Sequence, residues 1–144
     1  ANEQAKILLN GGGIGHRMGD LGYLDGKGRI WFCGRKSHRV VTPQGILFSV
    51  PTEGVFNQHP NVARTALVGV GIPPDQKPVL CVELKKTKGK KRKTIRAELL
   101  ELADLTQSTR NIRWILFRKS FPVDVRHNSK ILREKLAKWA ETRI

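Results

Sequence analysis

Residues Phe121–Lys130 read FPVDVRHNSK and run directly into Ile131–Ala140, which read ILREKLAKWA. Leu132, Leu136 and Trp139 recur at the i, i+4, i+7 spacing of one helix face, so they can anchor this helix in a core. That anchoring fixes the last residue of the preceding polar loop relative to the body of the domain. We therefore predict a helix over 131–140 and a lysine held where it can be aimed at a ligand.

A second informative stretch, Met18–Val40, reads MGDLGYLDGKGRIWFCGRKSHRV. Tyr23–Leu24 and Arg29–Phe32 are β-prone runs. They flank Asp25–Gly28, whose glycines permit the positive φ angles that tight hairpin turns require. This pattern predicts a β-hairpin.

Between these stretches, short apolar runs alternate with turn signals. Val40–Val41 and Ile46–Phe48 are β-prone and are separated by the turn-like segment Thr42–Gly45. We then expect a short helix that Thr52 caps and Pro60 ends.

Three further runs have the pattern of strands: Ala63–Val70, Val79–Leu84 and Ile112–Phe117. A helical stripe between the second and third strands consists of Ile95, Leu99, Leu102 and Leu105. The order of elements predicts an α+β fold, in which the N-terminal β-hairpin is followed by a small, mostly antiparallel or mixed sheet of about three strands flanked by helices. We expect residues 1–15 to be a tail or inter-domain linker and residues 16–144 to form one domain.

The chain is strongly basic, with 27 Lys and Arg against 12 Asp and Glu and a formal net charge of +15. Such an excess attracts polyanions, nucleotides or an acidic protein surface. Much of it lies in Lys85–Lys93, which reads KKTKGKKRK. We interpret this block as a solvated loop. Because no stacking aromatic residue interrupts it, a nucleic-acid-binding module is the less favoured alternative.

Cys33 and Cys81 lie in apolar, strand-like runs without metal-ligand spacing, so we expect buried free thiols of a reducing compartment. No run approaches the roughly 18 apolar residues of a membrane span, and the N-terminal residues lack the pattern of a secretion signal. These observations predict a cytoplasmic protein.

Three landmarks occur in a fixed order along the chain: Gly19-Asp20-Leu21, then Gly34-Arg35, then Ser129-Lys130. In this respect the chain resembles the adenylate-forming enzymes, the superfamily of acyl-CoA synthetases, luciferases and peptide-synthetase adenylation domains. The resemblance implies that residues 16–144 are the C-terminal lid domain of such an enzyme. The large N-terminal domain is then absent from this chain, and the fragment alone is expected to be catalytically inactive.

The resemblance also implies roles for particular residues. Asp20 matches the aspartate that grips the ribose of ATP, and Arg35 matches a nucleotide-contacting arginine whose rigid fork suits hydroxyl or phosphate oxygens. Ser37 falls at the hinge about which the lid swings, and neighbouring Lys36 could share that role. Lys130 matches the catalytic lysine that bridges the substrate carboxylate and the α-phosphate, where charge accumulates during adenylation.

His127, close to Lys130 in sequence, is a candidate general base for a substrate hydroxyl, because an unperturbed histidine has a pKa near 6.5. The four histidines do not form a spaced cluster, so we expect no metal site. Glu53, Asn57 and His59 have the pattern of ordinary helix surface. Arg133 is expected to point away from the site.

Two departures from the common family pattern refine the expected function. Ser129 replaces the glycine that usually precedes the lysine, and Thr42–Gly45, which reads TPQG, replaces the small-residue element that admits the pantetheine arm of CoA. Proline stiffens that loop and removes a donor. The amino-acid sequences of Trp31–Val40 and Val123–Ile131 are similar to those of the β-lactone synthetases of bacterial olefin biosynthesis.

That similarity implies an ATP-dependent enzyme of lipid metabolism that adenylates a 2-alkyl-3-hydroxy fatty acid and cyclises it to a β-lactone. ATP and Mg²⁺ are the implied cofactors, bound mainly by the large domain. The implied partners are the chain's own N-terminal domain, the fatty 3-hydroxy acid and other enzymes of olefin biosynthesis. A long-chain fatty acyl-CoA synthetase lid is the alternative within the class, and a basic module that binds nucleic acid or a partner protein is the alternative outside it.

Overall fold

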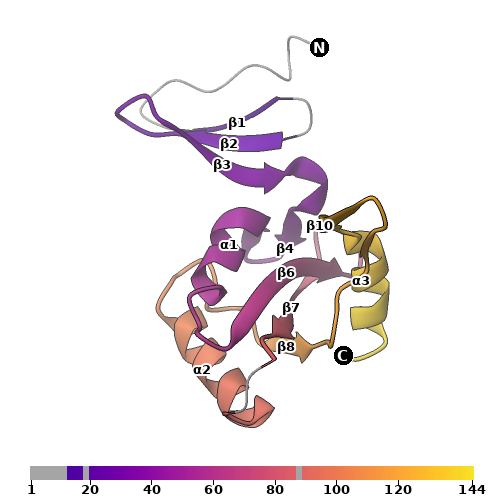
Figure 1. The fold of residues 1–144 in the computed structure, drawn as a ribbon. Helices are drawn as coiled ribbons and strands as arrows, with labels where there is room; N and C mark the ends of the chain where they lie inside the picture. Colours follow the sequence, from indigo (N-terminus) through magenta and orange to yellow (C-terminus); the bar gives the residue numbers. More distant parts are fainter. Residues whose placement is uncertain (1–12, 18–19, 87–88) are drawn as a thin grey trace.

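A computed structural model describes residues 13–17, 20–86 and 89–144. Figure 1 shows a small antiparallel sheet that stands apart from an α/β body. The elements in chain order are β1 Gly13–Arg17, β2 Asp20–Leu24, β3 Ile30–Arg35, the 3-10 helix η2 Lys36–His38, β4 Val40–Thr42, β5 Gly45–Leu47, α1 Ser49–Phe56, β6 Val62–Val70, β7 Lys77–Leu84, α2 Arg92–Asp104, β8 Trp114–Phe117, β9 Val123–Asp124, β10 His127–Ile131 and α3 Arg133–Glu141. The predicted α+β class with a small mixed sheet is confirmed.

The body is built on a three-stranded sheet in the order β6-β7-β8. β6 pairs with β7 in antiparallel register, and β7 pairs with β8 in parallel register. Alternate residues of each strand face opposite sides of a sheet. Accordingly, Leu67 and Leu80 belong to a buried cluster shared with α1 and α2, whereas Ala66 and Cys81 belong to a second cluster shared with α3. The sheet is thus covered on both faces by helices.

The β1-β2-β3 sheet precedes this body and is antiparallel throughout. The predicted hairpin turn at Asp25–Gly28 is present, and β1 adds a strand that begins at Gly13, three residues before the predicted start of the domain. The predicted tail over residues 1–12 lies outside the described residues. Every described member of the two buried clusters lies at Val40 or later.

One glycine permits the close contact between the two units. Gly34, near the end of β3, has a φ of +120°, and a Cβ atom there would lie 2.2 Å from the Ser49 side-chain oxygen at the start of α1. A side chain at this position would therefore meet both backbone strain and a clash.

Several predicted boundaries were wrong. α1 begins at Ser49, so Thr52 lies inside the helix and is buried rather than capping it. Pro51 is tolerated in the first turn because the N–H groups of that turn lack intrahelical partners. α2 ends at Asp104, which leaves Leu105 80% exposed instead of on the buried stripe.

The predicted start of the last helix also differs from the structure. α3 begins at Arg133 rather than at Ile131, because the preceding residues 127–131 form the strand β10 and pair with β9. Lys130 therefore lies in a strand, not in an irregular loop. Leu136 is buried as predicted, and Trp139 packs against the second cluster.

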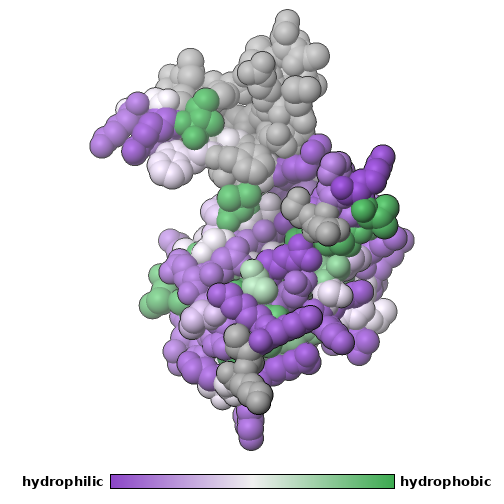
Figure 2. Space-filling view, in the orientation of Figure 1, coloured by the Kyte–Doolittle hydropathy of each residue, from purple (hydrophilic) through white to green (hydrophobic). Residues whose placement is uncertain are grey.

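Two further features of the body are its hydrophilic visible face (Figure 2) and a buried free thiol. Figure 2 shows that hydrophilic residues dominate its visible face. Among the described residues, no helix combines the length and apolar character needed to cross a membrane. Cys81 is a buried free thiol, and its removal from water raises its pKa to about 12. The side chain of Cys33 lies outside the description.

Candidate active site at the hinge pocket

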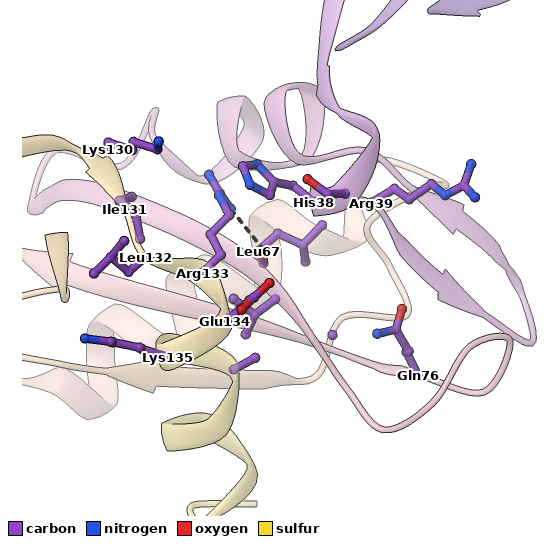
Figure 3. A pocket seen from close by; sticks show the side chains of 14 residues that line it. His38, Arg39, Leu67, Gln76, Lys130, Ile131, Leu132, Arg133, Glu134 and Lys135 are labelled. Carbon is purple, nitrogen blue, oxygen red and sulfur yellow. Dashed lines mark hydrogen bonds between the residues drawn. The ribbon is translucent and has the colours of Figure 1, made fainter. Parts of the chain in front are cut away.

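A pocket of about 420 Å³ lies where η2, β6 and the β10-α3 junction meet. We call it the hinge pocket. Its lining consists of Ser37–Arg39, Leu67–Gly69, Gln76, Lys130–Lys135 and Ala137. Figure 3 shows that these side chains come from segments far apart in the sequence. The structure thus brings the predicted hinge residue and the predicted catalytic lysine to one pocket.

Lys130 enters this pocket from the fourth position of β10 and is exposed. The strand is anchored just beyond it, where the Leu132 amide donates to the Pro122 carbonyl at 2.8 Å. None of the ion pairs recorded among the described residues includes Lys130. Its ammonium group is therefore available for an anionic ligand.

The opposite side of the pocket is formed by Ser37, His38 and Arg39. Ser37 is the central residue of η2, which has no buried residue and which joins β3 to β4. A short, unburied connection between two packed units can absorb backbone rotation without loss of core contacts. Lys36 is exposed but does not line the pocket. The hinge role of both residues stays a prediction.

One residue of the pocket lining, Arg133, belongs to an ion pair that sequence analysis missed. Arg133 Nη1 donates to Glu53 Oε2 at 2.7 Å and Nη2 donates to Glu53 Oε1 at 3.2 Å. Arg133 was expected to point away from the site, and Glu53 was expected on the helix surface; both expectations were wrong. The side chains are only 16% and 12% exposed, respectively.

The other two residues expected on the helix surface also make specific contacts. Asn57 accepts a hydrogen bond from the Thr65 hydroxyl at 2.9 Å. His59 is buried, and its Nε2 lies 2.8 Å from Glu98. Contacts with Lys90 and then with His59 lower the pKa of Glu98. The available signal was the spacing of four between Glu53 and Asn57, which puts both on one face of a helix.

The two predicted nucleotide-binding residues lie on the separate sheet. Asp20 and Arg35 are register partners across β2 and β3, so the fold places them on neighbouring strands. Arg35 is exposed, whereas only the backbone of Asp20 is described. Arg35 does not line the hinge pocket. If Asp20 and Arg35 bind the same nucleotide as Lys130, as predicted, the sheet and the hinge pocket must face that nucleotide from two sides.

His127 is the first residue of β10, is exposed, and does not line the hinge pocket. The register of β10 against β9 is irregular between His127 and Ile131, so simple strand alternation does not relate His127 to Lys130. Its role as a general base stays a prediction. Among the described residues, no group of three or more His, Cys, Asp or Glu could hold a metal ion.

Comparison with known proteins gives two kinds of similarity. The fold matches solved structures of an anthranilate CoA ligase in complex with anthranoyl-AMP (TM-score 0.74, 24% identity, 89% of this chain and 25% of that chain). It also matches a Mycobacterium tuberculosis fatty acyl CoA synthetase (TM-score 0.66, 16% identity, 89% and 24%). No family model matches the chain. The chain has the fold of the C-terminal domain of adenylate-forming enzymes.

Sequence similarity is more specific than the fold. The chain is 52% identical over 126 residues to an olefin beta-lactone synthetase of Xanthomonas campestris, which covers 87% of this chain and 23% of that protein. It is 49% identical over 129 residues to an olefin beta-lactone synthetase of Stenotrophomonas maltophilia, with 90% and 23% covered. The chain thus spans about a quarter of the length of these relatives and is similar to their C-terminal part.

Proposed function

We propose that this chain is the lid of an ATP-dependent β-lactone synthetase and that Lys130 is its catalytic residue. The observation that carries the proposal is the convergence of Lys130 and the hinge segment Ser37–Arg39 on one pocket. A lid that pivots at that segment would swing Lys130 toward or away from a substrate bound to the large domain. The sequence similarity to two olefin beta-lactone synthetases supports the reaction class.

In the first step, a carboxylate oxygen of a 2-alkyl-3-hydroxy fatty acid attacks the α-phosphorus of ATP, and pyrophosphate leaves. Two anions meet in this step, so a positioned cation stabilises the charge that builds up on the phosphoryl oxygens. The Lys130 ammonium would donate hydrogen bonds to the carboxylate and to an α-phosphate oxygen at once. Besides Arg133, which is paired with Glu53, the lining of the hinge pocket contains Arg39, Lys130 and Lys135 against one carboxylate, Glu134, and this set suits phosphate oxygens.

In the second step, the 3-hydroxyl oxygen of the acyl-adenylate attacks the acyl carbon, AMP leaves, and the hydroxyl proton passes to a base. No thiol acceptor is needed. The turn Thr42–Gly45 agrees with this reaction, because it is closed tightly by two hydrogen bonds. The Thr42 hydroxyl donates to the Gly45 carbonyl at 2.8 Å and accepts from the Gln44 amide at 3.2 Å. We assign Mg²⁺ to the large domain.

The test is the Lys130→Ala substitution in the full-length enzyme. Loss of one preorganised stabilising group is expected to lower kcat for pyrophosphate release by about 100- to 1,000-fold, which corresponds to about 2.7 to 4 kcal/mol. The fold should persist, because an exposed lysine buries little area. Lys138→Ala is the matched control, since Lys138 lies in α3, is exposed, and does not line the pocket. Unchanged pyrophosphate release in Lys130→Ala would refute the assignment.

The same assay distinguishes the alternative within the class. With a 3-hydroxy acid as substrate, a β-lactone synthetase should release AMP at the same rate with and without CoA. Consumption of CoA and accumulation of an acyl thioester would instead identify a fatty acyl-CoA synthetase.

A further inference from the structure

The most constrained polar contact at the hinge pocket joins three elements of the body. Arg133 in α3 holds both carboxylate oxygens of Glu53 in α1, and its Nη1 also donates to the Leu67 carbonyl in β6 at 3.1 Å. The Leu67 amide donates in turn to Glu53 Oε2 at 2.8 Å. The dashed line in Figure 3 follows the contact from Arg133 to Leu67.

The geometry of this hydrogen-bond network fixes the orientation of the side chains in addition to stabilising their contact. A guanidinium that meets a carboxylate through two parallel hydrogen bonds fixes the orientation of both groups. The Glu53 carboxylate accepts three hydrogen bonds, two from Arg133 and one from Leu67. Because both side chains are mostly shielded from water, loss of one partner would leave the other charge uncompensated.

The segment that carries Lys130 needs such an anchor. β9 and β10 form a separate two-stranded ribbon, and their register is irregular between His127 and Ile131. Isolated two-stranded ribbons are marginally stable in water. Arg133 lies three residues beyond Lys130, whereas Glu53 lies in the first helix after the hinge segment. The ion pair therefore connects the segment that carries Lys130 directly to the helix that follows the hinge segment.

We propose that Arg133 and Glu53 are positioning residues that fix Lys130 relative to the hinge segment. This inference rests on the proposed function of Lys130. A lid that rotates as a rigid body positions its lysine accurately only if the strand that carries the lysine does not move relative to the hinge segment. Misplacement of a catalytic group by about 1 Å can cost about 100-fold in rate. The Arg133–Glu53 ion pair restricts this relative movement without touching the substrate.

The decisive experiment is a double-mutant cycle in the full-length enzyme. Arg133→Lys keeps the charge but loses the two-pronged geometry. We expect it to lower kcat for pyrophosphate release by about 10- to 100-fold, while the KM for ATP changes less than about 3-fold, since the large domain holds the nucleotide. In the Lys130→Ala background, Arg133→Lys should cause no further fall, because a positioning residue acts only through the group it positions.

A matched control separates this effect from the general loss of an ion pair. Arg113 pairs with Asp104 in a solvent-exposed contact, and neither residue lines the pocket. Arg113→Lys makes the same chemical change and should leave kcat within about 2-fold of the parent, as expected for a surface pair. If Arg133→Lys prevents folding, as judged by the loss of a cooperative unfolding transition, Glu53→Gln replaces it, because glutamine keeps the size and one acceptor oxygen.

Each outcome decides between the proposals. Parent-like pyrophosphate release in Lys130→Ala overturns the proposed function and, with it, the positioning role. An impaired Lys130→Ala enzyme together with a parent-like Arg133→Lys enzyme overturns the positioning role alone. An equal further loss when both substitutions are combined also overturns it, since the ion pair would then support the fold rather than the lysine.

Discussion

In the β1-β2-β3 sheet, the turn carboxylate of Asp25 accepts hydrogen bonds from the Trp31 indole at 2.9 Å and from the Arg29 amide at 3.0 Å. The body from Val40 onward relies instead on two buried apolar clusters that sandwich its sheet. Ile30 and Trp31 are exposed on the first unit, whereas the body buries residues as large as Phe56 completely. The described side-chain contacts of the first unit are thus local and polar, whereas the second unit is stabilised mainly by apolar burial.

This difference bears on the pivoting motion that the proposed function requires. A unit whose stability is internal can move as a rigid body, because rotation at η2 breaks none of its own packing. In the hairpin unit, the apolar side chains of Ile30 and Trp31 are exposed, as on a surface that a neighbouring domain covers. Three substitutions or titrations test the contrast, in order of expected effect.

The largest effect should come from Phe56→Ala in the body. Phe56 is fully buried in the cluster between α1, α2 and the sheet. Its truncation leaves a cavity and is expected to reduce the free energy of unfolding by about 3 to 5 kcal/mol. Ile30→Ala in the hairpin unit, where Ile30 is 63% exposed, should change it by less than about 0.5 kcal/mol. Chemical denaturation followed by circular dichroism measures both. Equal effects would contradict the contrast.

An intermediate effect is expected where the two units touch. Gly34→Ala introduces a Cβ atom against Ser49 at a positive φ, so we expect a loss of about 1 to 3 kcal/mol from strain, with displacement of the contact in addition. Gly45→Ala is the control for strain, because Gly45 also has a positive φ of +136° but nothing within 4 Å of the new atom. If both variants unfold at the same denaturant concentration, the contact with Ser49 contributes nothing.

The smallest effect concerns the pH dependence of the hairpin. The hydrogen bond from Trp31, helped by the Arg29 and Lys27 amides, lowers the pKa of Asp25 from 3.8 to about 2. Because the folded-state pKa is the lower one, the carboxylate stabilises the hairpin above about pH 3.8 and loses this contribution as the pH falls toward about 2. The Trp31 indole N–H resonance should titrate with a midpoint near 2, and Asp25→Asn should abolish the transition. A midpoint near 4 would show that the contact is not formed.

Local patterns predicted the elements well where period and turn chemistry agreed. The apolar runs of β6 and β7 and the glycine-containing turn at Asp25–Gly28 are examples of such agreement. β10 was missed because its residues have no alternating apolar pattern; it forms only because β9 offers a partner. Only two residues separate β9 from β10, so the pairing is a local hairpin, and its irregular register departs from the alternation by which strands are recognised in sequence.

The candidate site was predictable only in part. Lys130 and Ser37 were found from the resemblance to a family, and the fold brings both to one pocket. The partnership of Glu53 with Arg133 spans 80 positions in sequence, and each residue alone looks like an ordinary charged residue of a helix. Only the packing of α1 and α3 against β6 reveals that these charges are buried against each other.

The position of Val40 as the first described member of the buried clusters has a consequence for the history of such enzymes. A recombination event with its crossover inside Lys36–His38 would cut no buried packing of the body, because η2 contains no buried residue. The transferred gene segment would carry the lysine together with the Glu53 and Arg133 that surround it. Among the described residues, the contact of β3 with α1, where Gly34 meets Ser49, would need to match across the new junction. If the proposed function holds, the exchange of whole lids between synthetases of different acceptor chemistry would therefore disrupt little packing.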